Sequence, residues 1–164
     1  MAQRMTAQHM SPDMMRSHYR MFGLNLVVSL IIMYFVMFTM IWSFGEFFHN
    51  LNMFYMAVMM ATPMGILMLQ MMGMMYPNKQ LNRVLYALCA LLFILAFWAM
   101  RAQGLVGDRQ FVRAMIPHHS GAILMCNRAS LQDPKIRDLC FKPEGIVESP
   151  KREIERMKAF LAGQ

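Results

Sequence analysis

The sequence predicts an all-α protein in which three transmembrane helices precede an extramembrane helical hairpin. Long apolar runs without charge are confined to the first hundred residues, whereas most charged residues come later. In addition, 57% of the 164 residues are hydrophobic and the mean hydropathy is +0.35. This composition is too apolar for an ordinary soluble domain and indicates a protein that lies in a lipid bilayer.

Three runs without a charged residue, at 22–45, 51–76 and 84–100, are the predicted membrane helices. A helix needs about 20 apolar residues to cross the hydrocarbon layer of ~30 Å. The first two runs exceed this length, and the third reaches it if residues 81–83 snorkel at its start. The first run is longer than the apolar part of a signal peptide and no small-residue cleavage site follows it, so we expect it to remain as an anchor.

The placement of Lys and Arg predicts the orientation of these helices. The N-terminal tail has three arginines and the second loop has Lys79 and Arg83, whereas the first loop, 46–50, has neither Lys nor Arg. The positive-inside rule therefore puts the N-terminus and the second loop in the cytoplasm and the C-terminal part outside. Three arginines follow the third helix on its outer side, but a whole domain can cross a membrane regardless of its charge. We expect this topology in a bacterial inner (plasma) membrane.

Three parts are expected along the chain: a cytoplasmic tail at 1–20, a transmembrane domain at 21–103 and an extracytoplasmic domain at 104–164. Ser11 followed by Pro12 is typical of a helix start. The Met and His residues around this start are Met5, His9, Met10, Met14 and His18. They form either a metal-collecting segment or an ordinary polar tail.

The extracytoplasmic domain reads as a helical hairpin. We expect one helix over 109–131, a turn at 132–134, and a second helix that Pro143 and Pro150 interrupt before it resumes over 151–161. Two helices cannot bury a sizeable core alone. Pairing of two hairpins into a four-helix bundle is the natural remedy, so we expect a homodimer or higher homo-oligomer.

The stretch from Met115 to Cys126 gathers two thioethers, two imidazoles and a thiol. On a helix, Met115, His118 and Met125 share one face, and His119 and Cys126 share the adjacent face. Thioether and thiolate sulfur favour Cu(I), and imidazole also suits copper. The chain has 23 methionines in all. The pattern predicts a Cu(I) site formed by these side chains, with Cys126 as an auxiliary ligand and Ag(I) as a second candidate ion; the alternative is that the methionines only fill a core.

Cys126 and Cys140 lie seven residues before and after Asp133, so they should stand level on facing helices. In an oxidising compartment this arrangement favours a disulfide, whereas a bound metal would favour two thiolates at a soft site. Cys89 lies within the third membrane helix and does not compete for either role.

Three stretches of the C-terminal part, 111–125 with its Met-Ile-Pro-His-His core, 133–136 and 152–158, resemble the domain of unknown function 305 family. The resemblance covers roughly residues 108–162. It implies a ferritin-like helical bundle, as in a family several of whose members bind copper outside the cytoplasm and support copper tolerance. The ligand roles that it implies fall on Met115, His118, His119, Met125 and Met157.

The chain departs from that family pattern in its second helix, where Pro150 and the extra residues 141–145 occur. In a plain hairpin centred on Asp133, Met157 would lie level with residue 109. At a rise of 1.5 Å per residue this is roughly 13 Å from His118, too far for one shared site. We therefore expect Met157 to serve a second site or a partner chain.

The second membrane helix carries a series of methionines at every fourth position: Met56, Met60, Met64, Met68 and Met72. This series winds around the helix, and it forms either adaptable packing or a path for Cu(I). With its three membrane helices, Met-rich N-terminus and Met-x-x-x-Met spacing, this part is similar to the eukaryotic copper transporter family. It lacks that family's Gly-x-x-x-Gly in the third helix, so the similarity is one of function only.

Other functional classes fit the sequence less well. The net charge of +7 does not indicate nucleic-acid binding, because residues 101–164 interleave 11 Lys or Arg with 7 Asp or Glu. Glu46 and His49 have the Glu-x-x-His spacing of di-iron bundles, but such a site needs two of these motifs. At most, these two residues supplement a metal site. No nucleophile is paired with His118 or His119, so we expect no enzyme activity.

We therefore expect an integral membrane Cu(I)-binding protein that contributes to copper buffering or tolerance, with copper-exporting proteins as candidate partners. Two alternatives stay open. One is a Cu(I) transporter that uses the methionines of the second membrane helix, and the other is a structural membrane protein without metal.

Overall fold

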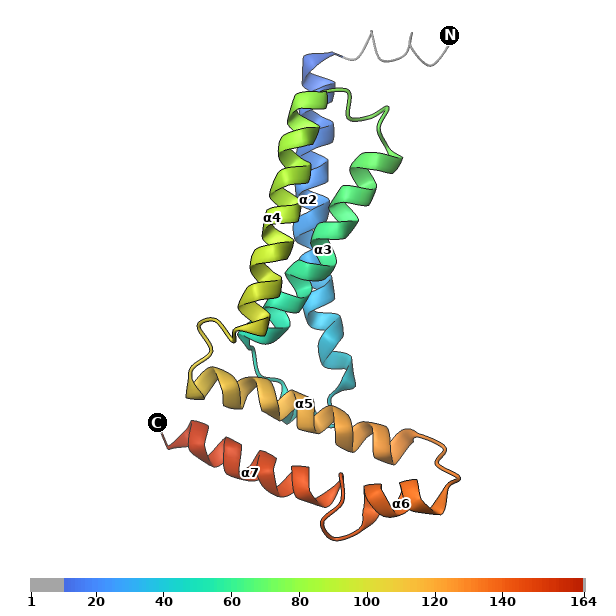
Figure 1. The fold of residues 1–164 in the computed structure, drawn as a ribbon, viewed down its shortest axis with the longest axis vertical. Helices are drawn as coiled ribbons and strands as arrows, with labels where there is room; N and C mark the ends of the chain where they lie inside the picture. Colours follow the sequence, from blue (N-terminus) through green and yellow to red (C-terminus); the bar gives the residue numbers. More distant parts are fainter. Residues whose placement is uncertain (1–10, 164) are drawn as a thin grey trace. The chain divides into compact units, whose positions relative to one another are not determined.

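The computed structural model describes residues 11–163, and every regular element among them is a helix (Figure 1). This confirms the all-α prediction. The candidate donors Met5, His9 and Met10 of the N-terminal tail lie outside the described residues.

The chain divides into two compact units. The first holds the described residues up to Tyr34 together with Phe54–Gly104, and the second holds Phe35–Met53 together with the described residues from Leu105 onward. The first loop thus belongs to the same unit as the C-terminal hairpin, whereas we expected it within the transmembrane domain at 21–103.

The first unit is built from α2 (Pro12–Val36), α3 (Leu51–Met71) and α4 (Lys79–Arg101), whose ends at Val36 and Leu51 extend into the second unit. All three helices are long and apolar enough to cross a membrane, as predicted. Ser11 Oγ accepts a hydrogen bond from Met14 N at 3.2 Å, and Asn78 Oδ1 caps α4 by accepting from Leu81 N at 3.0 Å. The expected start of α2 and the turn before α4 are therefore confirmed.

Close packing within the first unit depends on Gly65 in α3. A Cβ built at this position would lie 3.0 Å from Leu26 of α2 and 3.4 Å from Cys89 Sγ of α4. The missing side chain lets α3 approach both neighbours. At the C-terminal end of α3, about one turn beyond Gly65, Leu69 forms a buried cluster with Phe22 and Tyr76.

The second unit contains α5 (Asp108–Arg128), α6 (Pro134–Phe141) and α7 (Glu148–Ala162), together with the short turns η1 (Met37–Met40) and η2 (Phe44–Glu46). The helix α2 ends before these turns, so the first loop is longer than the predicted 46–50 and comprises the whole segment 37–50 between α2 and α3. Helices α5 and α7 run antiparallel (Figure 1). Pro150 lies in the first turn of α7, where its missing N–H needs no partner, so it does not delay the helix to residue 151 as expected.

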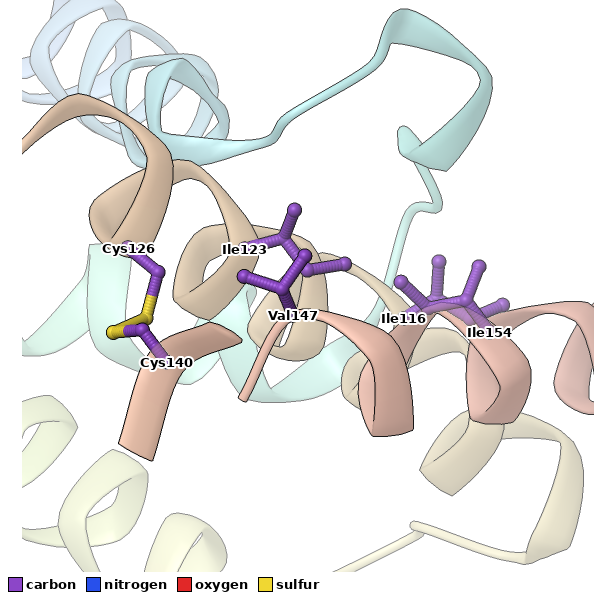
Figure 2. Close-up of a cluster of buried hydrophobic side chains, with 6 residues drawn as sticks. All are labelled: Ile116, Ile123, Cys126, Cys140, Val147 and Ile154. Atoms are coloured by element: carbon purple, nitrogen blue, oxygen red, sulfur yellow. A yellow bond between two sulfur atoms is a disulfide. The ribbon is translucent and has the colours of Figure 1, made fainter. Parts of the chain in front are cut away.

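The hairpin has two different registers. Near the turn, Cys126 and Cys140 form a disulfide, and this pair is level in a plain hairpin centred on Asp133. Farther along, Val147 lies against Ile123, and Ile154 against Ile116 (Figure 2). A plain hairpin would instead pair Ile116 with residue 150. The segment 142–147 therefore shifts α7 by four residues along α5.

We expect loss of the disulfide to destabilise the second unit. The bond joins residues 14 apart, and a loop of this length corresponds to about 3 kcal/mol of unfolding free energy. Cys126→Ala with Cys140→Ala should show this loss in denaturant unfolding of the full chain in mild detergent. Reduction of the parent protein should have the same effect. Without reductant, the unfolded parent should expose one reactive thiol, that of Cys89, and three thiols would contradict the bond.

Candidate metal site

Helix α5 presents two different faces to α7. Ile116 and Ile123, seven residues apart, are 0% and 1% exposed and form the core of the second unit. Met115 and His119, four residues apart, lie along the edge of this core and line a pocket of about 430 Å³. The side chains that line the pocket are Phe111, Met115, His119, Glu153, Arg156 and Met157.

Met157 lines the same pocket as Met115 and His119, and this corrects the expectation that it lies too far away. The physical reason is the register shift of α7. It brings Met157 level with residue 113 instead of residue 109, about 6 Å closer to His119 along the helix axis. Two thioethers and one imidazole, contributed by two helices, therefore surround one pocket.

His118 and Met125 do not line this pocket. His118 is exposed, and the centres of the His118 and His119 rings are 6.3 Å apart because adjacent helical residues point in different directions. Met125 is 54% exposed and lies ten residues beyond Met115, a rise of roughly 15 Å along α5. The expected common site of Met115, His118 and Met125 is therefore not assembled by the fold.

Cys126 also differs from its expected role. Its sulfur is bonded to Cys140, and both residues are buried in the core (Figure 2). Of the two alternatives that the sequence allowed, the structure has the disulfide. In this oxidised form Cys126 provides no thiolate for a metal.

Charged groups sit beside the sulfur donors. Glu153 Oε2 lies 3.0 Å from His119 Nδ1, although the angle of this contact is outside that of a hydrogen bond. A carboxylate next to one imidazole nitrogen is the arrangement that orients metal-binding histidines, with the other nitrogen as the ligand.

Outside the pocket, at the start of α7, Lys151 donates a hydrogen bond to Glu148 at 2.8 Å. This hydrogen bond lowers the pKa of the Glu148 carboxyl from its ordinary value.

The donor set fits a soft ion. Among residues 11–163, no group of three or more His, Cys, Asp or Glu side chains is arranged to hold a metal. A metal at this pocket would therefore need the sulfurs of Met115 and Met157 in addition to the His119 imidazole. Thioether sulfur suits Cu(I), whereas Mg²⁺ and Ca²⁺ need oxygen ligands.

The first loop docks on α5 through residues whose role the sequence analysis missed. Ser120 Oγ accepts a hydrogen bond from Trp42 N at 2.6 Å and donates to Glu46 Oε2. A Cβ built at Gly121 would lie 3.5 Å from Met40 O, an ordinary van der Waals distance, so the loop packs directly against α5 at this glycine. The Ser-x-x-Glu spacing of Ser43 and Glu46, a capping-box signature, was the available signal.

Glu46 and His49, considered above as supplementary ligands, do not line the pocket. Glu46 is 8% exposed and its carboxylate accepts from Ser43 N and Ser120 Oγ. The His49 ring lies against the ring of Phe47, with the ring centres 4.9 Å apart.

A second gathering of methionines lies in the first unit. Met21, Met68 and Met72 line a pocket of about 380 Å³ between α2 and α3 together with Asn25 and Tyr76. Asn25 Nδ2 and Tyr76 Oη donate to Met68 Sδ at 3.6 and 3.8 Å. Met68 and Met72 are the last two members of the predicted methionine series.

The chain is similar to a known domain family and to one viral protein. The family described as a domain of unknown function (DUF305) matches residues 97–161. Uncharacterized protein L153 of Acanthamoeba polyphaga mimivirus is 30% identical over 123 residues, which cover 73% of this chain and 76% of that protein. That coverage reaches beyond the hairpin into the membrane helices. No solved structure matches the chain. Similarity over this much of both proteins, together with the domain match, shows that the chain belongs to the DUF305 family.

Proposed function

We propose that this membrane protein binds Cu(I) in its extramembrane unit, through Met115, His119 and Met157, and contributes to copper buffering or tolerance rather than catalysis. Ag(I) is the second candidate ion, because it shares the preference for soft donors. The observation that carries the proposal is the pocket between α5 and α7, which two thioethers and an imidazole line together.

The charged groups of the pocket leave the choice of ion to the soft donors. Arg156 is the one cationic side chain among the pocket-lining residues, and the carboxylate of Glu153 offsets it. These two opposite charges largely cancel for a cation of either valence, so the thioethers and the imidazole rather than net charge favour Cu(I). Cu(I) and Ag(I) carry a single charge and bind thioethers without any proton loss.

The proposed location is a bacterial inner membrane, with the N-terminus in the cytoplasm and the hairpin outside. The distribution of Lys and Arg supports this orientation. The disulfide between Cys126 and Cys140 supports it independently, because disulfides persist mainly in oxidising compartments. A ferritin-like homodimer and copper-exporting partners stay predictions of the sequence analysis.

Variants of the three pocket ligands test the proposal. Met115→Leu and Met157→Leu remove sulfur at similar size, and His119→Gln removes the imidazole. Each should weaken Cu(I) binding by more than about tenfold, the effect typical of losing even an outer-shell partner of a metal. Competition with a chromophoric Cu(I) chelator measures the affinity, with ascorbate as reductant so that the disulfide survives.

His118→Gln and Met125→Leu are the matched controls, because these side chains do not line the pocket and should leave the affinity unchanged. Loss of copper in these two variants, with normal binding by the pocket variants, would move the site to the exposed face of α5. If the parent protein binds neither Cu(I) nor Ag(I), the proposal is wrong and the alternative of a structural membrane protein without metal stands.

A second candidate function is Cu(I) transport through the first unit. The observation that favours it is the pocket lined by Met21, Met68 and Met72, which places three thioethers between two membrane helices. Polar side chains in a membrane span are costly and are usually kept for a function, and Asn25 lies at this pocket.

If the first unit transports Cu(I), Met68→Leu with Met72→Leu should lower Cu(I) flux into sealed vesicles by about tenfold or more. Each methionine supplies a soft thioether ligand, whereas leucine has no atom that can bind Cu(I). Met60→Leu with Met64→Leu is the matched control from the same methionine series, because neither side chain lines the pocket. Equal flux in both double variants, or no flux in the parent, would exclude transport by this path.

A further inference from the structure

Glu46 is a buried carboxylate that connects three segments of the second unit. Its Oε2 accepts hydrogen bonds from Ser43 N, at 3.2 Å, and from Ser120 Oγ on α5. Its Oε1 lies 3.9 Å from Lys158 Nζ on α7. The carboxylate is thus shared between the first loop and the two helices that form the metal pocket.

The residues that Glu46 contacts are sequence neighbours of the proposed ligands. Ser120 directly follows His119 on α5, and Lys158 directly follows Met157 on α7. Adjacent helical residues point about 100° apart, so each helix turns one residue toward the pocket and the next toward Glu46. A displacement of either helix relative to the loop would move a ligand and a Glu46 partner together.

We propose that Glu46 is a positioning residue for the metal pocket, and that it sets the separation of α5 and α7 by holding Ser120 with one oxygen and Lys158 with the other. That this pocket binds a metal rests on the proposed function. Glu46 does not line the pocket, and both of its oxygens face protein groups, so it acts through the two helices rather than as a ligand.

The proposal connects the first loop to metal affinity. The loop joins α2 to α3 and lies against α5 through Ser120 Oγ and Gly121. Any change in the loop that displaces Glu46 would alter the spacing of His119 and Met157. The first loop would therefore regulate a site to which it supplies no ligand.

Three substitutions separate the two arms of this bridge. Glu46→Gln keeps an oxygen for Ser43 and Ser120 but turns an amide toward Lys158, so it cuts the arm to α7. Lys158→Leu cuts the same arm from the other side without adding a sulfur donor, and Ser120→Ala cuts the arm to α5 together with the hydrogen bond from Trp42 N. Each change is small and keeps the core isoleucines intact.

The first measurement uses the metal-free full chain in detergent micelles, with ¹³C-labelled methionine methyl groups. Glu46→Gln and Lys158→Leu should each shift the Met157 resonance, and their combination should add nothing further. Ser120→Ala should shift the Met115 resonance. The resonance of Met125, which is 54% exposed and does not line the pocket, should stay in place in the Glu46 and Lys158 variants. Met157 and Met115 resonances that do not move in any of these variants would overturn the proposal.

The second measurement is affinity for Ag(I) by titration. Glu46→Gln should lower it by about tenfold, as for loss of other outer-shell partners, and the double variant with Lys158→Leu should be no weaker. Glu148→Gln is the matched control, since it breaks the exposed pair of Glu148 with Lys151 on α7, the helix that also carries Lys158. Ile123→Val controls for a general loss of stability and should leave the affinity unchanged.

The two measurements distinguish this inference from the proposed function. If the parent protein binds no Ag(I) or Cu(I), the proposed function fails, and the methyl resonances still decide whether Glu46 positions these side chains. If Glu46→Gln binds as tightly as the parent while Met157→Leu does not, the pocket stands and the positioning role is wrong.

Discussion

The pocket of this protein depends on the offset between the two ends of its hairpin. The disulfide of Cys126 and Cys140 fixes one register close to the turn, and the contact of Ile154 with Ile116 fixes another, four residues different. Isoleucine is stiff at its first side-chain torsion, so two nearly fully buried isoleucines tolerate little sliding. The segment between the two registers must absorb the difference, and Met157 reaches Met115 for this reason.

The first loop explains how so small a helical unit buries a core. Two helices alone would leave one side of α5 uncovered, and this argument led to the expectation of a second hairpin from a partner chain. In the structure, the loop covers part of that side. Phe48 packs against the core cluster, and Gln110 Oε1 accepts a hydrogen bond from Leu51 N at 3.3 Å. The loop thus supplies apolar contacts and satisfies polar groups at the same time.

The sequence predicted the membrane helices and the hairpin well, because uncharged length and amphipathic period are properties of each segment alone. The equal spacing of Cys126 and Cys140 from Asp133 also predicted that they lie level. The sequence could not predict the shift of α7 by four residues along α5. Helical periodicity shows which face of a helix is apolar, but not which residue of the neighbouring helix each residue lies opposite. The same limit separated Met157 from Met115. His118 and Met125 were grouped with Met115 because the three share a helical face, but a shared face does not bring together residues that are up to roughly 15 Å apart along one helix.

The docking of the loop on Ser120 also bears on where the folding unit begins. The family match starts at residue 97, yet Trp42, Ser43 and Glu46 complete the surface of α5 from a part of the chain that precedes it. An excised C-terminal fragment would expose the Ser120 hydroxyl and the surface of α5 at Gly121 to water, and Lys158 would lose the Glu46 carboxylate. The second compact unit is therefore discontinuous in sequence, because the chain leaves it through α3 and returns to it after α4.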